Sequence, residues 1–82
     1  MPPVPVTVFW RPMCGHCDVL KRALARRDIA FEAIDIWEDR SQADVVKAAT
    51  GGDEIVPTVR VGSDLFLVNP SIDQVVAAVA AA

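Results

Sequence analysis

The apolar residues in the first half of the chain follow the two-residue period of β-strands. Residues 4–10 (VPVTVFW) are rich in β-branched and aromatic side chains, and residues 31–36 (FEAIDI) alternate apolar with polar positions. Proline cannot donate a hydrogen bond within a sheet, so Pro5 places the start of the first strand at Val6. The pattern predicts two strands separated by a segment long enough for a helix.

Two further apolar runs near the end of the chain predict a hairpin. Residues 57–61 (PTVRV) and 65–68 (LFLV) are separated only by residues 62–64, Gly-Ser-Asp, which suit a three-residue hairpin turn. Strands joined this tightly pair antiparallel. Strands joined through a helix, as the first two are, must instead be parallel with a right-handed crossover.

Residues 14–27 have the period of an amphipathic helix. The apolar residues that recur at helical spacing and are expected to face the core are Val19, Leu20, Ala23 and Leu24. The basic residues expected on the solvated side are Lys21, Arg22, Arg26 and Arg27. They lie late in the helix, where the helix dipole favours cations.

Two more helices have recognisable start signals. One is expected to begin at Ser41, with Asp44 in a variant of the capping box, and to end at residues 51–52, both glycine. Its expected apolar stripe is Val45, Val46 and Ala49. The last is expected to begin at Ser71, with Gln74 at the reciprocal position, and to continue into the alanine tail. Its inward residues are expected to be Ile72, Val75, Val76 and Val79.

Together these elements predict an α/β fold in the order β-α-β-α-β-β-α, a four-stranded mixed sheet flanked by three helices. A chain of 82 residues fits one domain, spanning residues 1–82. The hydrophobic content of 52% argues against disorder. A formal net charge of −3, without a run of basic residues, argues against nucleic acid as a partner.

The chain shows no signal peptide or membrane span, so we expect a cytoplasmic monomer with no membrane partner. Its start, Met-Pro-Pro-Val-Pro, lacks a basic stretch ahead of an apolar one. The longest uncharged stretches, residues 1–10 and 74–82, are too short to cross a bilayer. Thiols in that compartment are kept reduced, which bears on the two cysteines.

The two cysteines form a Cys-x-x-Cys motif where a strand passes into a helix. Cys14 is expected at the helix N-terminus, where unpaired N–H groups and the helix dipole stabilise a thiolate and lower its pKa below about 8.5. Cys17 lies nearly one turn further in and is expected to be more buried. The spacing therefore predicts Cys14 as the attacking nucleophile and Cys17 as the resolving thiol.

His16 lies between the cysteines, with Gly15 beside it. An imidazolium at this position favours the thiolate and stabilises the reduced dithiol, which makes the disulfide a stronger oxidant. The alternative is an exposed polar residue with no role in the chemistry.

Other roles for the cysteines fit the sequence less well. A zinc site needs four ligands, and no second Cys/His pair accompanies Cys14, His16 and Cys17, so no metal site is expected. A structural bridge over so short a loop restrains little chain entropy. An iron–sulfur cluster shared between two chains stays open as an alternative of a different class.

Four short motifs resemble the glutaredoxin branch of the thioredoxin-like superfamily, and the likeness covers nearly the whole chain. They are residues 14–17 (Cys-Gly-His-Cys), 51–52 (Gly-Gly), 56–59 (Val-Pro-Thr-Val) and 69–71 (Asn-Pro-Ser). The combination is most similar to the mycoredoxins, which use mycothiol in place of glutathione. The resemblance implies a thioredoxin-like fold and a low-molecular-weight thiol, mycothiol or glutathione, as co-substrate, with no tightly bound cofactor.

The resemblance also implies where substrate binds. It implies a cis Val56-Pro57 bond beside Cys14, which costs only about 0.5–1 kcal/mol for proline. The backbone of Val56 can then pair with an extended substrate segment as an added strand. The residues it implies for substrate binding are Val56, Pro57, Thr58, Asn69, Pro70 and Ser71.

The chain departs from the family pattern at three places. Residues 65–73 lack the acidic, glycine-rich clamp that holds the charged ends of glutathione, which favours a less charged, sugar-like thiol. Met13 stands before the nucleophile, where an aromatic residue is common, and Trp10 is expected to lie too deep to line the groove. The Cys-Gly-His-Cys tetrapeptide is also that of protein disulfide isomerases.

Two residues near the motif have open roles. Arg11, three residues before Cys14, can stabilise the thiolate or an anionic part of a ligand. Trp37, just past the second strand, either lines the thiol groove or covers the end of the sheet.

The sequence as a whole predicts a thiol–disulfide oxidoreductase that reduces mixed disulfides between proteins and mycothiol. A second thiol is expected to release Cys14, with Cys17 offering a competing internal disulfide. The rival enzyme is a thioredoxin-like dithiol donor that a flavoprotein reductase reduces. The expected partners are therefore a small thiol, disulfide-bearing proteins and such a reductase.

Overall fold

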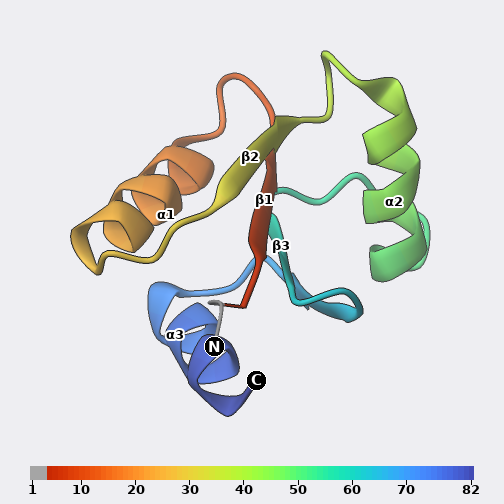
Figure 1. Cartoon of the computed structure of the whole chain (residues 1–82). Coiled ribbons are helices and arrows are strands. Elements are labelled where there is room, and N and C mark those ends of the chain that lie inside the picture. The colour runs from red at the N-terminus through yellow and green to blue at the C-terminus, as the bar shows by residue number, and fades with distance from the viewer. Residues whose placement is uncertain (1–3) are drawn as a thin grey trace.

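The computed structural model describes residues 4–82; residues 1–3 of the predicted domain lie outside the described part. Its elements, in chain order, are β1 Val6–Trp10, α1 Gly15–Arg26, β2 Glu32–Asp35, α2 Arg40–Thr50, β3 Thr58–Val61, β4 Leu65–Val68 and α3 Ile72–Ala81 (Figure 1). This is the predicted order, and the first strand starts at Val6 as Pro5 indicates.

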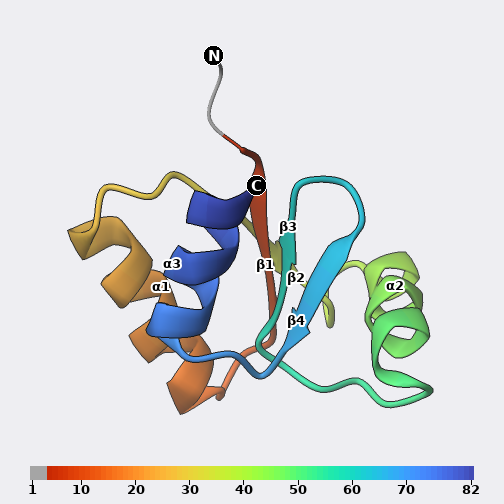
Figure 2. The same cartoon turned by 90° about the horizontal axis from the view of Figure 1, so that it is seen from below.

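The strands form one mixed sheet in the order β2-β1-β3-β4. β1 pairs parallel with β2, and β3 pairs antiparallel with β4, as the helix and hairpin connections predict. The sheet is completed by an antiparallel pairing of β1 with β3. Figure 2 shows α1 and α3 on one face of the sheet and α2 on the other.

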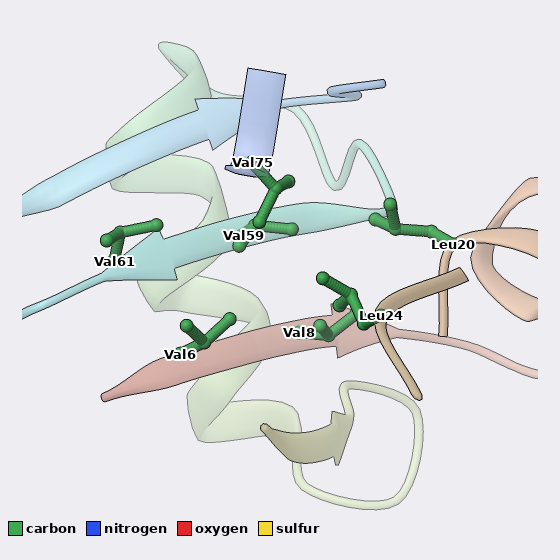
Figure 3. Close-up of a cluster of buried hydrophobic side chains, with 7 residues drawn as sticks. All are labelled: Val6, Val8, Leu20, Leu24, Val59, Val61 and Val75. Atoms are coloured by element: carbon green, nitrogen blue, oxygen red, sulfur yellow. The ribbon is translucent and has the colours of Figure 1, made fainter. Parts of the chain in front are cut away.

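Side chains on opposite faces of the sheet build two apolar clusters. Successive residues of a strand point to opposite faces, so Val8 joins the cluster under α1 and α3 while Phe9 joins the cluster under α2. The buried residues of the first cluster are Val6, Val8, Leu20, Leu24, Val59, Val61 and Val75 (Figure 3). The buried residues of the second are Phe9, Ile36, Ala43 and Val46.

The ends of α1 and α3 follow the sequence signals. Cys14 is the N-cap of α1. Ser71 caps α3 with the full reciprocal box: its hydroxyl accepts from the Gln74 N–H, and its own N–H donates to Gln74 Oε1. Gly51 ends α2 in the left-handed conformation, with φ of 88°.

The predicted start of α2 at Ser41 is wrong. The helix begins at Arg40, and its N-cap is Asp39, whose carboxylate accepts from the Ser41 N–H at 3.1 Å. Ser41 therefore lies inside the first turn, and its hydroxyl donates to Asp39 as well. Aspartate and serine are about equally good N-cap residues, so the helix can start at the earlier of the two, which is Asp39.

The predicted inward position of Val19 is also wrong. Its side chain is 57% exposed, whereas Cys17, Leu20 and Leu24 form the buried line of α1. Each residue turns about 100° around a helix, so Val19 lies outside the strip that those three residues define. None of the helices within residues 4–82 is long and apolar enough to cross a membrane.

Candidate functional site

Cys14 and Cys17 lie at the start of α1 and form a disulfide. Cys14 has extended backbone geometry as the N-cap, and its side chain is 9% exposed. Cys17, in the first turn, is fully buried. Cys14 thus keeps a small exposed part while Cys17 is completely covered, and this relative burial agrees with the sequence prediction.

The surroundings of the Cys14 sulfur suit a negative charge. The Cys17 N–H donates to Cys14 Sγ at 3.2 Å, and the sulfur stands at the positive end of the helix dipole. Met13, which precedes the N-cap of α1, has a left-handed φ of 64° and is 86% exposed. The space where Gly15 would carry a side chain has no atom within 4 Å, so the surface over residue 15 is open.

The segment before β3 forms a second side of the site. The Val56-Pro57 peptide bond is cis, as the resemblance implies, and the Val56 carbonyl oxygen lies 4.0 Å from Cys14 Sγ. Pro57 and Thr58 are fully buried, and the Thr58 hydroxyl donates to the Ile55 carbonyl at 2.7 Å. Of the three residues in this segment that the resemblance implies for substrate binding, Val56 is partly exposed, whereas Pro57 and Thr58 are buried.

The segment before α3 forms a third side. Asn69 is exposed, has φ of 49°, and donates its N–H to the Pro57 carbonyl at 2.8 Å. Pro70 is buried, and its carbonyl accepts from His16 Nε2 at 3.2 Å. Residues 14–17, 56–58 and 69–71 therefore meet at one end of the sheet, which Figure 2 shows where α1, β3 and the link into α3 converge.

Arg11 contacts Trp37 and its own chain. Its guanidinium lies 5.2 Å from the centre of the Trp37 ring and donates to the Pro12 carbonyl at 2.9 Å. Trp37 is 50% exposed. The pair forms a cation–π contact at the surface. No hydrogen bond from Arg11 to the Cys14 sulfur is among those that the described residues make, and its alternative role toward an anionic part of a ligand stays a prediction.

Lys21 does not lie on the solvated face as predicted. Its side chain is 22% exposed, and Nζ lies 3.6 Å from the centre of the Trp10 ring. It also forms an ion pair with Asp18 at 3.7 Å. The Trp10 indole N–H is buried without a hydrogen-bond partner among the described residues, which agrees with its predicted depth. The sequence carries no signal for this contact, since it needs α1 docked on β1.

A second ion pair missed by the sequence holds the loop that leads to Val56. Arg40 Nη1 donates to Glu54 at 2.7 Å and to the Ile36 carbonyl at 3.2 Å, so it links α2 and the end of β2 to this loop. The hydrogen bond from Arg40 lowers the pKa of the Glu54 carboxyl, and Lys47 at 3.6 Å adds to the effect. Within residues 4–82 no three His, Cys, Asp or Glu side chains gather as metal ligands.

The fold and the disulfide at the start of α1 define a thioredoxin-fold redox protein. The crystal structure of mitochondrial thioredoxin 3 from Saccharomyces cerevisiae has the same fold, with a TM-score of 0.74 at 18% identity over 100% of this chain and 81% of that one. The glutaredoxin family model matches residues 6–66. The chain belongs to the glutaredoxin family and is a thiol–disulfide oxidoreductase.

Two curated relatives and one solved structure are similar over most of the chain. A Mycobacterium tuberculosis protein named "Putative glutaredoxin" is 39% identical over 85% of this chain and 83% of its own. Mycoredoxin 1 of Corynebacterium glutamicum is 30% identical over 93% and 94%. The structure of the glutaredoxin-like NrdH-redoxin from Escherichia coli has a TM-score of 0.76 at 25% identity, covering 89% of this chain and 92% of that one.

Proposed function

We propose that this protein reduces mixed disulfides between proteins and mycothiol, with Cys14 as the attacking thiolate. The observation that carries the proposal is the asymmetry of the two sulfurs. Cys14 keeps a small exposed part and accepts an N–H at the helix start, whereas Cys17 has no exposed surface. Only the first can meet a disulfide that arrives from solvent, and the cytoplasm suits the reaction because its thiols are reduced.

The proposed thiol–disulfide exchange proceeds in two steps. The Cys14 thiolate attacks the mycothiol sulfur of the mixed disulfide, forms a Cys14–mycothiol disulfide and releases the protein thiolate. A second mycothiol thiolate then attacks the mycothiol sulfur on Cys14, releasing the Cys14 thiolate and mycothiol disulfide. Cys17 can instead attack Cys14 Sγ and release mycothiol, which forms the internal disulfide seen here.

The segment before α3 favours a thiol with few charges. Asn69 uses its N–H on Pro57, Pro70 has none, and the Ser71 N–H is taken by Gln74. None of the three carries a basic side chain. The carboxylates of glutathione would find no cation and no free backbone N–H on these residues, only the neutral side-chain donors of Asn69 and Ser71. The hydroxyls of a sugar-bearing thiol can both donate to and accept from the exposed Asn69 side-chain amide.

The test compares mixed disulfides of mycothiol and glutathione on one carrier protein. We expect the reduced protein to react at least about tenfold faster with the mycothiol form, which corresponds to about 1.4 kcal/mol. Cys14→Ser should be inactive on both, which controls for uncatalysed exchange. Equal rates, or a preference for glutathione, would contradict the proposed co-substrate.

A second candidate function is that of a dithiol electron donor. The internal disulfide between Cys14 and Cys17 supports it, and the similar NrdH-redoxin from Escherichia coli is described as having a thioredoxin-like activity profile. An NADPH assay coupled through a flavoprotein thioredoxin reductase separates the two. Turnover that needs the reductase and no mycothiol favours the donor, and turnover that needs mycothiol favours the proposal above.

A further inference from the structure

The imidazole of His16 joins the turn between the cysteines to the segment that precedes α3. Its Nε2 lies 3.2 Å from the Pro70 carbonyl oxygen, across 54 positions of sequence. A carbonyl oxygen only accepts, so Nε2 carries the hydrogen and donates it.

The turn that carries His16 has few other ties. Met13 is 86% exposed, and Gly15 has no neighbouring atom where a side chain would begin. Cys17 is buried, but its covalent link to Cys14 lasts only while the disulfide is intact. Among the described residues, residues 13–17 make one side-chain hydrogen bond from a nitrogen to an oxygen of a distant segment, and it is the bond from His16 to Pro70.

The other end of this hydrogen bond is held firmly. The Pro70 side chain is fully buried, and Asn69 before it donates to the Pro57 carbonyl at 2.8 Å. Ser71 after it forms the capping box with Gln74. A side chain bonded to a carbonyl fixed on both sides takes its position from that carbonyl. His16 thus ties the first turn of α1 to the segment that precedes α3.

We propose that His16 is a positioning residue for thiol exchange. Its bond to Pro70 holds the Cys14 turn and residues 69–71 at a fixed separation, so that a mixed disulfide that contacts both is attacked in register. The inference rests on the proposed function, since it takes residues 69–71 as a wall of the thiol groove. It needs only an N–H donor at position 16, which distinguishes it from an effect of imidazolium charge on the thiolate.

Two substitutions separate the hydrogen bond from the charge. His16→Gln keeps an N–H donor at the same number of bonds from Cα, and His16→Leu has none; neither carries a charge. The probes are a mycothiol mixed disulfide and bis(2-hydroxyethyl) disulfide, which is too small to contact both segments. One neutral hydrogen bond contributes about 0.5–1.5 kcal/mol, so we expect His16→Leu to slow reduction of the mycothiol probe about 3- to 10-fold.

The two probes and the two variants give outcomes that decide the proposal. It predicts that His16→Leu leaves the small probe within about twofold of wild type, and that His16→Gln restores the mycothiol probe to within about twofold. Equal impairment of the Gln and Leu variants would show that charge acts instead. Equal slowing of both probes by His16→Leu would show a general effect on the sulfur. Either result overturns the positioning role.

Amide hydrogen exchange tests the tie without any substrate. In the reduced protein, we expect the Asp18 amide, which donates to the Cys14 carbonyl at 3.2 Å, to exchange about 3- to 10-fold faster in His16→Leu than in His16→Gln. Identical exchange in the two variants would overturn the proposal. If the wild-type protein does not react with the mycothiol mixed disulfide, the proposed function fails. The amide hydrogen exchange experiment still decides whether His16 holds the turn.

Discussion

Replacing Cys17 by serine should leave the attack of Cys14 almost intact. The group that donates to Cys14 Sγ is the backbone N–H of residue 17, at 3.2 Å, and a side-chain substitution keeps it. A hydrogen bond to a charged acceptor contributes about 1.5–3 kcal/mol, so its retention dominates the effect on the thiolate. We expect the rate of attack on a mycothiol mixed disulfide to stay within about threefold of wild type, or about 0.7 kcal/mol.

The same substitution should lower stability, for a reason visible in the burial of residue 17. Cys17 has no exposed surface, so serine places a hydroxyl where water cannot reach it, which costs about 1–3 kcal/mol without a partner. The disulfide spans a separation of only three residues, and a loop that short contributes about 2 kcal/mol through chain entropy. Cys17→Ala is the matched control, because it removes the sulfur without adding a polar group.

Single-turnover kinetics and urea unfolding measure the two effects separately. Each variant is mixed with the mycothiol mixed disulfide of a carrier protein, and release of the carrier thiol is followed. We expect Cys17→Ser and Cys17→Ala to react alike, the serine variant to unfold at lower urea, and Cys14→Ser to release nothing. If Cys17→Ser is as inactive as Cys14→Ser, the single-cysteine route is refuted and Cys17 is part of the obligatory chemistry.

Three further predictions concern the parts of the fold that hold the site. Asp39→Ala should lower the free energy of unfolding by about 0.5–2 kcal/mol in urea titrations, and Ser41→Ala should lower it by less, because Asp39 is the N-cap of α2. A larger loss in Ser41→Ala than in Asp39→Ala would contradict this assignment. Arg40 holds the pKa of Glu54 below its ordinary 4.5, so the ion pair stabilises the fold above that value and this stabilisation is lost as pH falls. The urea midpoint of wild type should therefore approach that of Arg40→Met between pH 6 and pH 3. A difference between the two midpoints that stays constant over this range would refute the pairing. Leu24→Ala should cost about 2–5 kcal/mol by thermal unfolding, because the side chain is fully buried under the sheet; a loss below about 1 kcal/mol would mean that α1 packs loosely.

The sequence predicted the features that short stretches of chain decide. The Ser71 and Gln74 box closes within one helical turn, and Gly51 ends α2 because only glycine adopts φ of 88° without strain. The three-residue turn likewise determines that β3 and β4 pair antiparallel. The Cys-x-x-Cys motif was found for the same reason, since its placement depends only on the strand before it and the helix after it.

The sequence failed where two local signals compete or where distant segments meet. Asp39 and Ser41 are both good caps, and the sequence alone does not show that the Asp39 carboxylate takes the Ser41 N–H. Apolar spacing alone admitted Val19 to the core, because it cannot tell the centre of a helix face from its edge. The contacts of His16 with Pro70, and of Lys21 with Trp10, depend on how α1 lies against α3 and β1, which no short motif encodes.

The reaction depends on a Cys14 thiolate at neutral pH, and two effects of the structure on it oppose each other. The N–H of residue 17 favours the thiolate by about 1.5–3 kcal/mol, and the N-terminal end of α1 favours it by about 0.3–1 kcal/mol. The small exposure of Cys14 opposes it. We expect the first to win, because the sulfur keeps a hydrogen bond and contact with solvent.

The rate of alkylation of Cys14 against pH measures this balance directly. In the reduced Cys17→Ser variant, iodoacetamide can report on residue 14 alone, since it is the remaining thiol. We expect a curve whose midpoint lies clearly below the ordinary cysteine value of about 8.5, with near-maximal reactivity at pH 7. A midpoint at or above that value would show that burial outweighs the helix start, and Cys14 would not be the nucleophile described here.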